Sequence, residues 1–105
     1  VPADCRVEFT EYGAGKAIRF PIEAPAFART AEALSAEWGK KAVFIGGGGS
    51  IPVTHELKKA LGMDVVLAGF ALEDDRIHSP NEKYDLESFR RGIRSWARVL
   101  HALAS

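Results

Sequence analysis

The chain has 105 residues, of which 47% are hydrophobic, and this length and composition suit one domain with a core. Its 14 Lys and Arg residues balance its 14 Asp and Glu residues, and no apolar run approaches the roughly 20 residues of a membrane-spanning helix. We therefore expect no nucleic-acid partner and no membrane partner. The single cysteine, Cys5, excludes an internal disulfide and favours a soluble, cytoplasmic protein.

The first 24 residues differ in pattern from the rest. Because the chain begins at Val1 without an initiator Met, we interpret it as part of a longer protein. Apolar residues alternate over residues 7–9 and again over 18–22, with Gly13 and Gly15 between the two segments. This pattern predicts a β-hairpin with a glycine turn, which interrupts the later rhythm of strands and helices and suits a separate domain.

A helix is predicted from Pro25 to Trp38, where apolar residues recur every three or four positions until Gly39. The run Ala42–Ile45 then reads as a short strand buried on both faces. It leads into four glycines and a second helix, for which Ser50 is the expected N-cap and Gly62 the C-terminal stop.

The remaining residues predict another strand and a long helix. Asp64–Leu72 is largely apolar, a polar loop follows, and Asp85 is the expected N-cap of the last helix. The apolar residues of this helix recur at helical spacing and are expected to pack on a sheet: Leu86, Phe89, Ile93, Trp96, Leu100 and Leu103. Alternating strands and helices predict an α/β fold with a mostly parallel sheet, preceded by the hairpin.

The glycine loop between strand and helix is the first candidate site. Backbone N–H groups and the positive end of the helix dipole converge there, which favours an anionic ligand. The loop nevertheless fits neither nucleotide signature, because Gly49 replaces the lysine of the phosphate-binding loop and Ile51 or Val53 replaces the third glycine of the dinucleotide motif. A small, non-enzymatic α/β module that binds an anion at this loop is therefore one interpretation of the sequence.

The histidines offer little chemistry by spacing alone. His55 starts a segment with Lys59 in place of the second histidine of a zinc motif, and both His55 and His101 are expected at helix surfaces. His78 lies in a loop after a strand, where α/β proteins commonly build sites, although a lone histidine is more often structural. Asp74 and Asp75 suggest no more than a solvated turn.

Two segments, GGSIPVTHELKKALG (residues 48–62) and DDRIHSPNEKYDLESFRRGI (residues 74–93), resemble the C-terminal end of the M20 metallopeptidases. This family includes dipeptidases, carnosinase-like enzymes and deacylases such as acetylornithine deacetylase and succinyldiaminopimelate desuccinylase. The resemblance covers most of residues 39–105 and extends more loosely over residues 1–38. It implies that residues 1–24 end a lid domain, often used for dimerisation, and that residues 25–105 belong to the zinc-peptidase catalytic domain.

The resemblance also implies roles for individual residues. His78 is expected to bind one metal of a two-metal centre, usually Zn²⁺ with Mn²⁺ or Co²⁺ as alternatives, while Gly49 and Ser50 are expected to bind the substrate. Asn81 and Glu82 are candidates for orienting His78, and holding the shape of the loop is an equally good interpretation of both. Gly46 and Gly47 depart from the family, whose members often have a polar pair at these positions.

The expected reaction is metal-assisted hydrolysis of the amide bond in a dipeptide or an N-acyl amino acid. The family's other metal ligands and its general base lie upstream of the matched region. No catalytic residue is therefore expected within this chain, and in isolation it should be inactive and metal-free. A homo-oligomer is expected, because a partial sheet exposes an edge and apolar faces.

Overall fold

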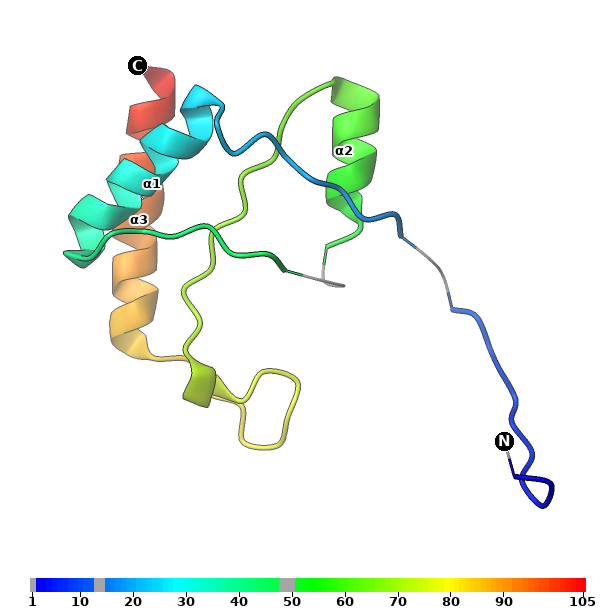
Figure 1. The fold of residues 1–105 in the computed structure, drawn as a ribbon. Coiled ribbons are helices and arrows are strands. Elements are labelled where there is room, and N and C mark those ends of the chain that lie inside the picture. The colour runs from blue at the N-terminus through cyan, green and yellow to red at the C-terminus, as the bar shows by residue number, and fades with distance from the viewer. Residues whose placement is uncertain (1, 13–14, 48–50) are drawn as a thin grey trace.

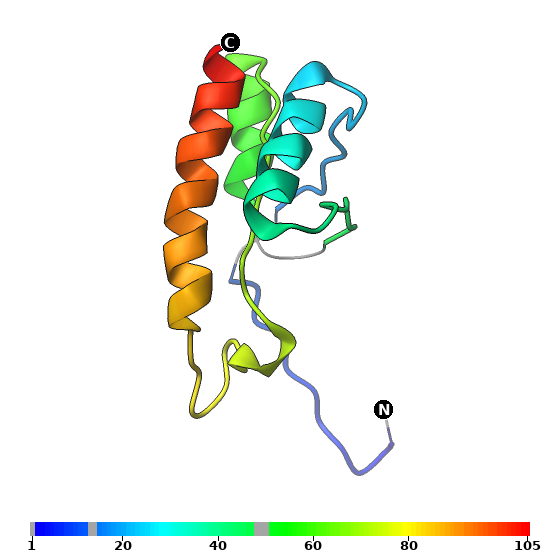
Figure 2. The same ribbon diagram turned by 90° about the vertical axis from the view of Figure 1, so that its left-hand side faces the viewer.

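The computed structural model describes residues 2–12, 15–47 and 51–105. Their elements, in chain order, are α1 (Pro25–Trp38), α2 (Val53–Leu61), the short 3-10 helix η1 (Glu73–Asp75) and α3 (Leu86–Ala104). Helices α1 and α3 lie side by side and run in opposite directions (Figures 1 and 2). They are the only pair of helices in contact within these ranges. None of the helices described is long and apolar enough to cross a membrane.

The helix boundaries follow local signals in the sequence. Pro25 opens α1, where its missing N–H costs nothing, and Gly39 ends the helix with a left-handed φ of 64°. Gly62 ends α2 in the same way, with a φ of 67°. Asp85 caps α3 by accepting two backbone N–H bonds of 2.8 and 3.2 Å from the first turn. These predicted ends are confirmed, whereas the predicted cap Ser50 lies outside the described residues and Pro52 holds the N-cap position of α2.

The contact between α1 and α3 is made by small side chains on α3. Ser88, Gly92 and Ser95 are buried together with Val99, at spacings of four, three and four residues that place them on one helix face. From α1, Phe27 and Thr30 are buried. Small residues let the two helix backbones approach closely, and this contact forms the core that the structure describes.

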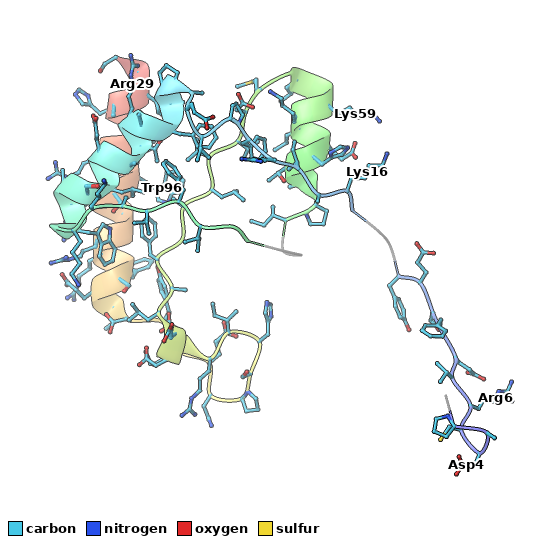
Figure 3. The ribbon with its side chains drawn as sticks, in the orientation of Figure 1. Asp4, Arg6, Lys16, Arg29, Lys59 and Trp96 are labelled. Carbon is cyan, nitrogen blue, oxygen red and sulfur yellow. The ribbon has the colours of Figure 1, made fainter. Side chains whose placement is uncertain are left out.

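An aromatic cluster extends this core. The ring of Phe70 stacks on Trp38 of α1, with centroids 5.8 Å apart and planes 9° from parallel. It also meets Trp96 of α3, which is labelled in Figure 3, edge to face with ring centroids 6.4 Å apart. Gly92 makes room for it, because a Cβ atom there would lie 3.1 Å from the Phe70 ring. Through Phe70, the coil after α2 therefore packs against both α1 and α3.

The predicted parallel sheet is wrong: no strand occurs in the described residues. The two segments expected as strands, 42–45 and 64–72, run as coil (Figure 1). They share no backbone hydrogen bond. Together with one side of α1 they line a groove of about 430 Å³. Strands must lie about 4.8 Å apart to bond. Apolar runs report a tendency to be buried, but they do not provide the neighbouring strand that pairing needs.

The predicted N-terminal hairpin is also contradicted, since residues 2–12 and 15–22 contain no strand. Phe9 and Tyr12 are 94% and 96% exposed, so nothing covers the first of the two segments. The second segment instead passes the start of α2, where a Cβ atom on Gly15 would lie 2.7 Å from Cβ of Pro52. A two-stranded hairpin is marginal without a third strand or a helix beneath it, which accounts for its absence.

The apolar stripe of α3 does not pack on a sheet. Its residues are 40–71% exposed: Leu86, Phe89, Ile93, Trp96, Leu100 and Leu103. The buried residues of α3 are the ones that contact α1, and each stands one position before a residue of the apolar stripe. Likewise, three apolar side chains of α2 are exposed: Val53, Leu57 and Leu61. Both helices keep an apolar surface because the described residues form no sheet to cover it.

Candidate functional site

The loop that carries His78 begins directly after η1 and ends before α3 (Figure 1). Two backbone bonds turn the loop, from Ser79 N–H to the Arg76 carbonyl at 3.0 Å and from Glu82 N–H to the Ser79 carbonyl at 3.2 Å. Three of its residues have left-handed backbones, Arg76 with φ 55°, His78 with φ 62° and Asn81 with φ 59°. Residues other than glycine rarely adopt this backbone conformation, so contacts with surrounding residues must hold the loop in shape.

Asp75 makes contacts that hold the loop in this shape. Its side chain is 1% exposed, and its carboxylate accepts the backbone N–H of Leu72 at 2.7 Å and the Nζ of Lys83 at 3.0 Å. The N–H of Lys83 donates to the carbonyl of Asp75 at 3.0 Å. One aspartate therefore joins the residues on both sides of the loop.

The charges around Asp75 shift two pKa values. The hydrogen bond from the Leu72 N–H, and after it the bond from Lys83, lower the pKa of the Asp75 carboxyl. Hydrogen bonds to Asp75 and then to Asp74 raise the pKa of the Lys83 amine. Both groups are therefore charged at neutral pH. The interpretation of Asp75 as part of a solvated turn is wrong, because its side chain is buried and fully bonded.

The residues expected in the site are only partly brought together. His78, Asn81 and Glu82 lie within five positions of one loop, and all three are exposed. Within the described ranges, their side chains form no hydrogen bond or ion pair with one another or with other residues. Gly49 and Ser50, the expected substrate-binding residues, lie outside the described residues.

His78 fits a metal as one ligand. Its imidazole is exposed and takes part in no hydrogen bond with the described residues, so a ring nitrogen is available to a divalent ion. No group of three His, Cys, Asp or Glu side chains that could hold a metal occurs in the part of the chain that the structure describes. A metal bound at His78 thus requires ligands beyond these residues.

The other two histidines lie on helices. His101 is exposed on α3, as expected. His55 on α2 is half-buried, and its Nδ1 atom is buried without a hydrogen-bond partner among the described residues. His55 is therefore more covered than the expected surface position, and it lies near the end of α2 where Gly15 lies against Pro52. Neither histidine lies in the loop of His78.

The sequence that contains this loop is similar to known peptidases. The model of "Peptidase family M20/M25/M40" matches residues 4–102. The chain is 44% identical over 62 residues to the Cys-Gly metallodipeptidase of Schizosaccharomyces pombe, covering 59% of this chain and 13% of the relative. The corresponding protein of Candida albicans is 37% identical over 75 residues, covering 71% and 16%. That of Saccharomyces cerevisiae is 34% identical over 99 residues, covering 94% and 20%.

These relatives are much longer than this chain, which spans 13–20% of their length. No solved structure matches it. The resemblance stated from the two sequence segments is confirmed by the family model, which covers nearly the whole chain.

Proposed function

This chain belongs to peptidase family M20/M25/M40, and on that basis we propose that it is part of a metal-dependent hydrolase that cleaves the amide bond of dipeptides or N-acyl amino acids. A dipeptide substrate is supported by the three similar proteins, each of which is named as a Cys-Gly metallodipeptidase. The observation that carries the proposal is the exposed imidazole of His78, which forms no hydrogen bond with the described residues and lies in a loop inside the matched region.

In this proposal His78 is a ligand of a two-metal centre that holds Zn²⁺, with Mn²⁺ or Co²⁺ as alternatives. When bound, the metals polarise the scissile carbonyl and lower the pKa of a bound water. Asn81 and Glu82 offer an amide and a carboxylate in the same loop, and either can accept the second imidazole N–H. Gly49 and Ser50 orient the carboxylate of the substrate.

The chain alone is proposed to be inactive and metal-free, because a two-metal centre needs several ligands and the described residues contain no group of three that could hold a metal. We assign residues 1–24 to the end of a lid domain and residues 25–105 to the catalytic domain. The change of character at Pro25, where coil gives way to α1, supports this division. A cytoplasmic location is proposed from the single, exposed Cys5.

Self-association is proposed as well. Six large apolar side chains along α3 are at least 40% exposed, and covering such a surface releases free energy in proportion to the area removed from water. A second copy is the occupant we propose for this face. The alternative of a non-enzymatic module that binds an anion at the glycine loop gains no support, because it requires the parallel sheet that the structure contradicts.

The role of His78 is tested in the complete gene product by His78→Ala. We expect metal affinity to fall by about 100-fold or more, since loss of a partner that only orients a ligand already costs roughly 10- to 100-fold. Hydrolysis of Cys-Gly should fall in parallel. The matched control is His101→Ala, which removes an exposed histidine on α3 and should leave both unchanged. Unchanged bound zinc and an unchanged rate in His78→Ala would reject the proposed ligand.

A further inference from the structure

We propose that Asp75 is a positioning residue for His78, holding the loop in the shape that presents the imidazole to a metal. This inference rests on the proposed role of His78 as a metal ligand. It concerns a residue three positions before His78, and it is carried by contacts of the Asp75 side chain that the loop's own turns do not supply.

The two ends of the loop meet at Asp75. Each carboxylate oxygen accepts one hydrogen bond, one from the N–H of Leu72 at 2.7 Å and the other from Nζ of Lys83 at 3.0 Å. The Lys83 backbone adds a third bond to the Asp75 carbonyl at 3.0 Å. Leu72 lies just before η1 and Lys83 just after His78, Asn81 and Glu82, so the aspartate closes the whole loop.

The loop needs such a closure because its backbone is strained. His78 itself has φ 62°, and Arg76 and Asn81 are left-handed on either side of it. Residues with a Cβ atom hold this conformation only when surrounding contacts determine it. If the contacts of Asp75 are lost, Arg76, His78 and Asn81 are free to return to ordinary backbone angles, and the imidazole is no longer held in one place.

Asp74 provides a natural comparison. It also pairs with Lys83, at 3.0 Å, but its side chain is 72% exposed while that of Asp75 is 1% exposed. No hydrogen bond between Asp74 and Leu72 occurs among the described residues. The two neighbouring carboxylates therefore share a lysine, but only the buried one is bonded to both ends of the loop.

The experiment uses the complete gene product and measures zinc affinity by competition with a chromophoric chelator, with circular dichroism to report the folded fraction. Asp75→Asn keeps an acceptor for the Leu72 N–H but loses the ion pair with Lys83. We expect a roughly tenfold loss of zinc affinity, as for other groups that orient a metal ligand. Hydrogen exchange of the loop amides should become faster in the same variant. Asp74→Asn is the matched control and should change neither quantity.

A double-mutant cycle shows whether Asp75 acts through His78. In a His78→Ala background, Asp75→Asn should cause no further loss of zinc affinity. A purely structural role for Asp75 would instead leave the zinc affinity of the folded protein unchanged even when His78 is present. If Asp75→Asn does not fold, Lys83→Met serves instead, since it breaks the ion pair and leaves the bond to Leu72. A fall in affinity supports the proposal, and an unchanged affinity overturns it.

The two proposals fail in different ways. If His78→Ala lowers zinc affinity but neither Asp75→Asn nor Lys83→Met does, the positioning role of Asp75 is wrong and the ligand role of His78 remains. An equal loss caused by Asp75→Asn with and without His78 also overturns the positioning role. If His78→Ala leaves zinc affinity unchanged, the ligand assignment itself fails.

Discussion

The indole Nε1 of Trp38 donates a hydrogen bond of 2.9 Å to the hydroxyl of Ser95, and this bond links α1 to α3 across 57 positions of sequence. Ser95 has no exposed surface. A hydroxyl on the small face of α3 thus receives a polar group that α1 brings into the helix contact, which explains why a serine is found in the core.

We expect Ser95→Ala to lower the free energy of unfolding by about 1 kcal/mol or somewhat more, because the indole N–H then loses its acceptor inside the helix contact. Urea denaturation followed by circular dichroism measures the change. The control is Ser105→Ala at the exposed end of α3, which should alter the free energy of unfolding by less than about 0.5 kcal/mol. Equal stability of the Ser95 and Ser105 variants would contradict the interpretation.

Gly92 is expected to tolerate no large side chain. In Gly92→Leu the new atoms would enter the space of the Phe70 ring, which a Cβ atom alone would approach to 3.1 Å. Overpacking of this kind costs about 1–3 kcal/mol. Near-ultraviolet circular dichroism should show a changed aromatic environment, and the urea midpoint should fall. Ala97→Leu, at an exposed position of the same helix, should leave both signals in place.

Glu37 should make stability depend on pH. Hydrogen bonds from Arg94 at 2.6 Å and Arg98 at 2.9 Å lower the pKa of its carboxyl in the folded state. Its contribution to stability is therefore fully present above the ordinary carboxyl pKa of the unfolded chain. It is lost as the pH falls through the lower folded-state pKa.

The measurement is the urea midpoint of wild type and Glu37→Gln from neutral to strongly acidic pH. The variant should be less stable at neutral pH, and the difference should shrink as the medium becomes acidic. Added salt should reduce the difference as well, because both arginines are about half exposed. Glu32→Gln, an exposed position on α1, is the control. A difference that stays constant with pH would argue against the ion pairs as its cause.

The chain should self-associate through the apolar stripe of α3. Sedimentation at increasing concentration should show species larger than a monomer, and replacing both Ile93 and Leu100 with Lys should shift the equilibrium toward monomer. Arg90→Ala, on the polar side of α3, is the control. A strictly monomeric wild type at high concentration would contradict this proposal.

The helices could be predicted from sequence because their signals are local. Pro25 and Gly39 set the ends of α1 by their own backbone preferences, and Asp85 needs only the next three residues to cap α3. The sheet could not be predicted in this way. Whether Ala42–Ile45 becomes a strand depends on a bonded neighbour that sequence periodicity does not identify.

The candidate site shows the same division. The sequence motif HSPNE contains His78, Asn81 and Glu82, and their place in one loop follows directly from their proximity in sequence. Asp75 was missed because its burial depends on Lys83, eight positions further along, and on the N–H of Leu72. The signal that could have identified it is an aspartate at the third position of a helical turn, where its carboxylate can reach back to the N-cap N–H.

The position of Phe70 has a practical consequence for anyone who handles this chain. It contains two tryptophans, and both of them touch the same phenylalanine ring, one from each long helix. The guanidinium of Arg91 also lies 5.3 Å from the centre of the Trp38 ring. All of the intrinsic tryptophan fluorescence therefore originates at one junction. Its emission is a label-free optical probe of whether the two long helices are docked, without any dye or added residue.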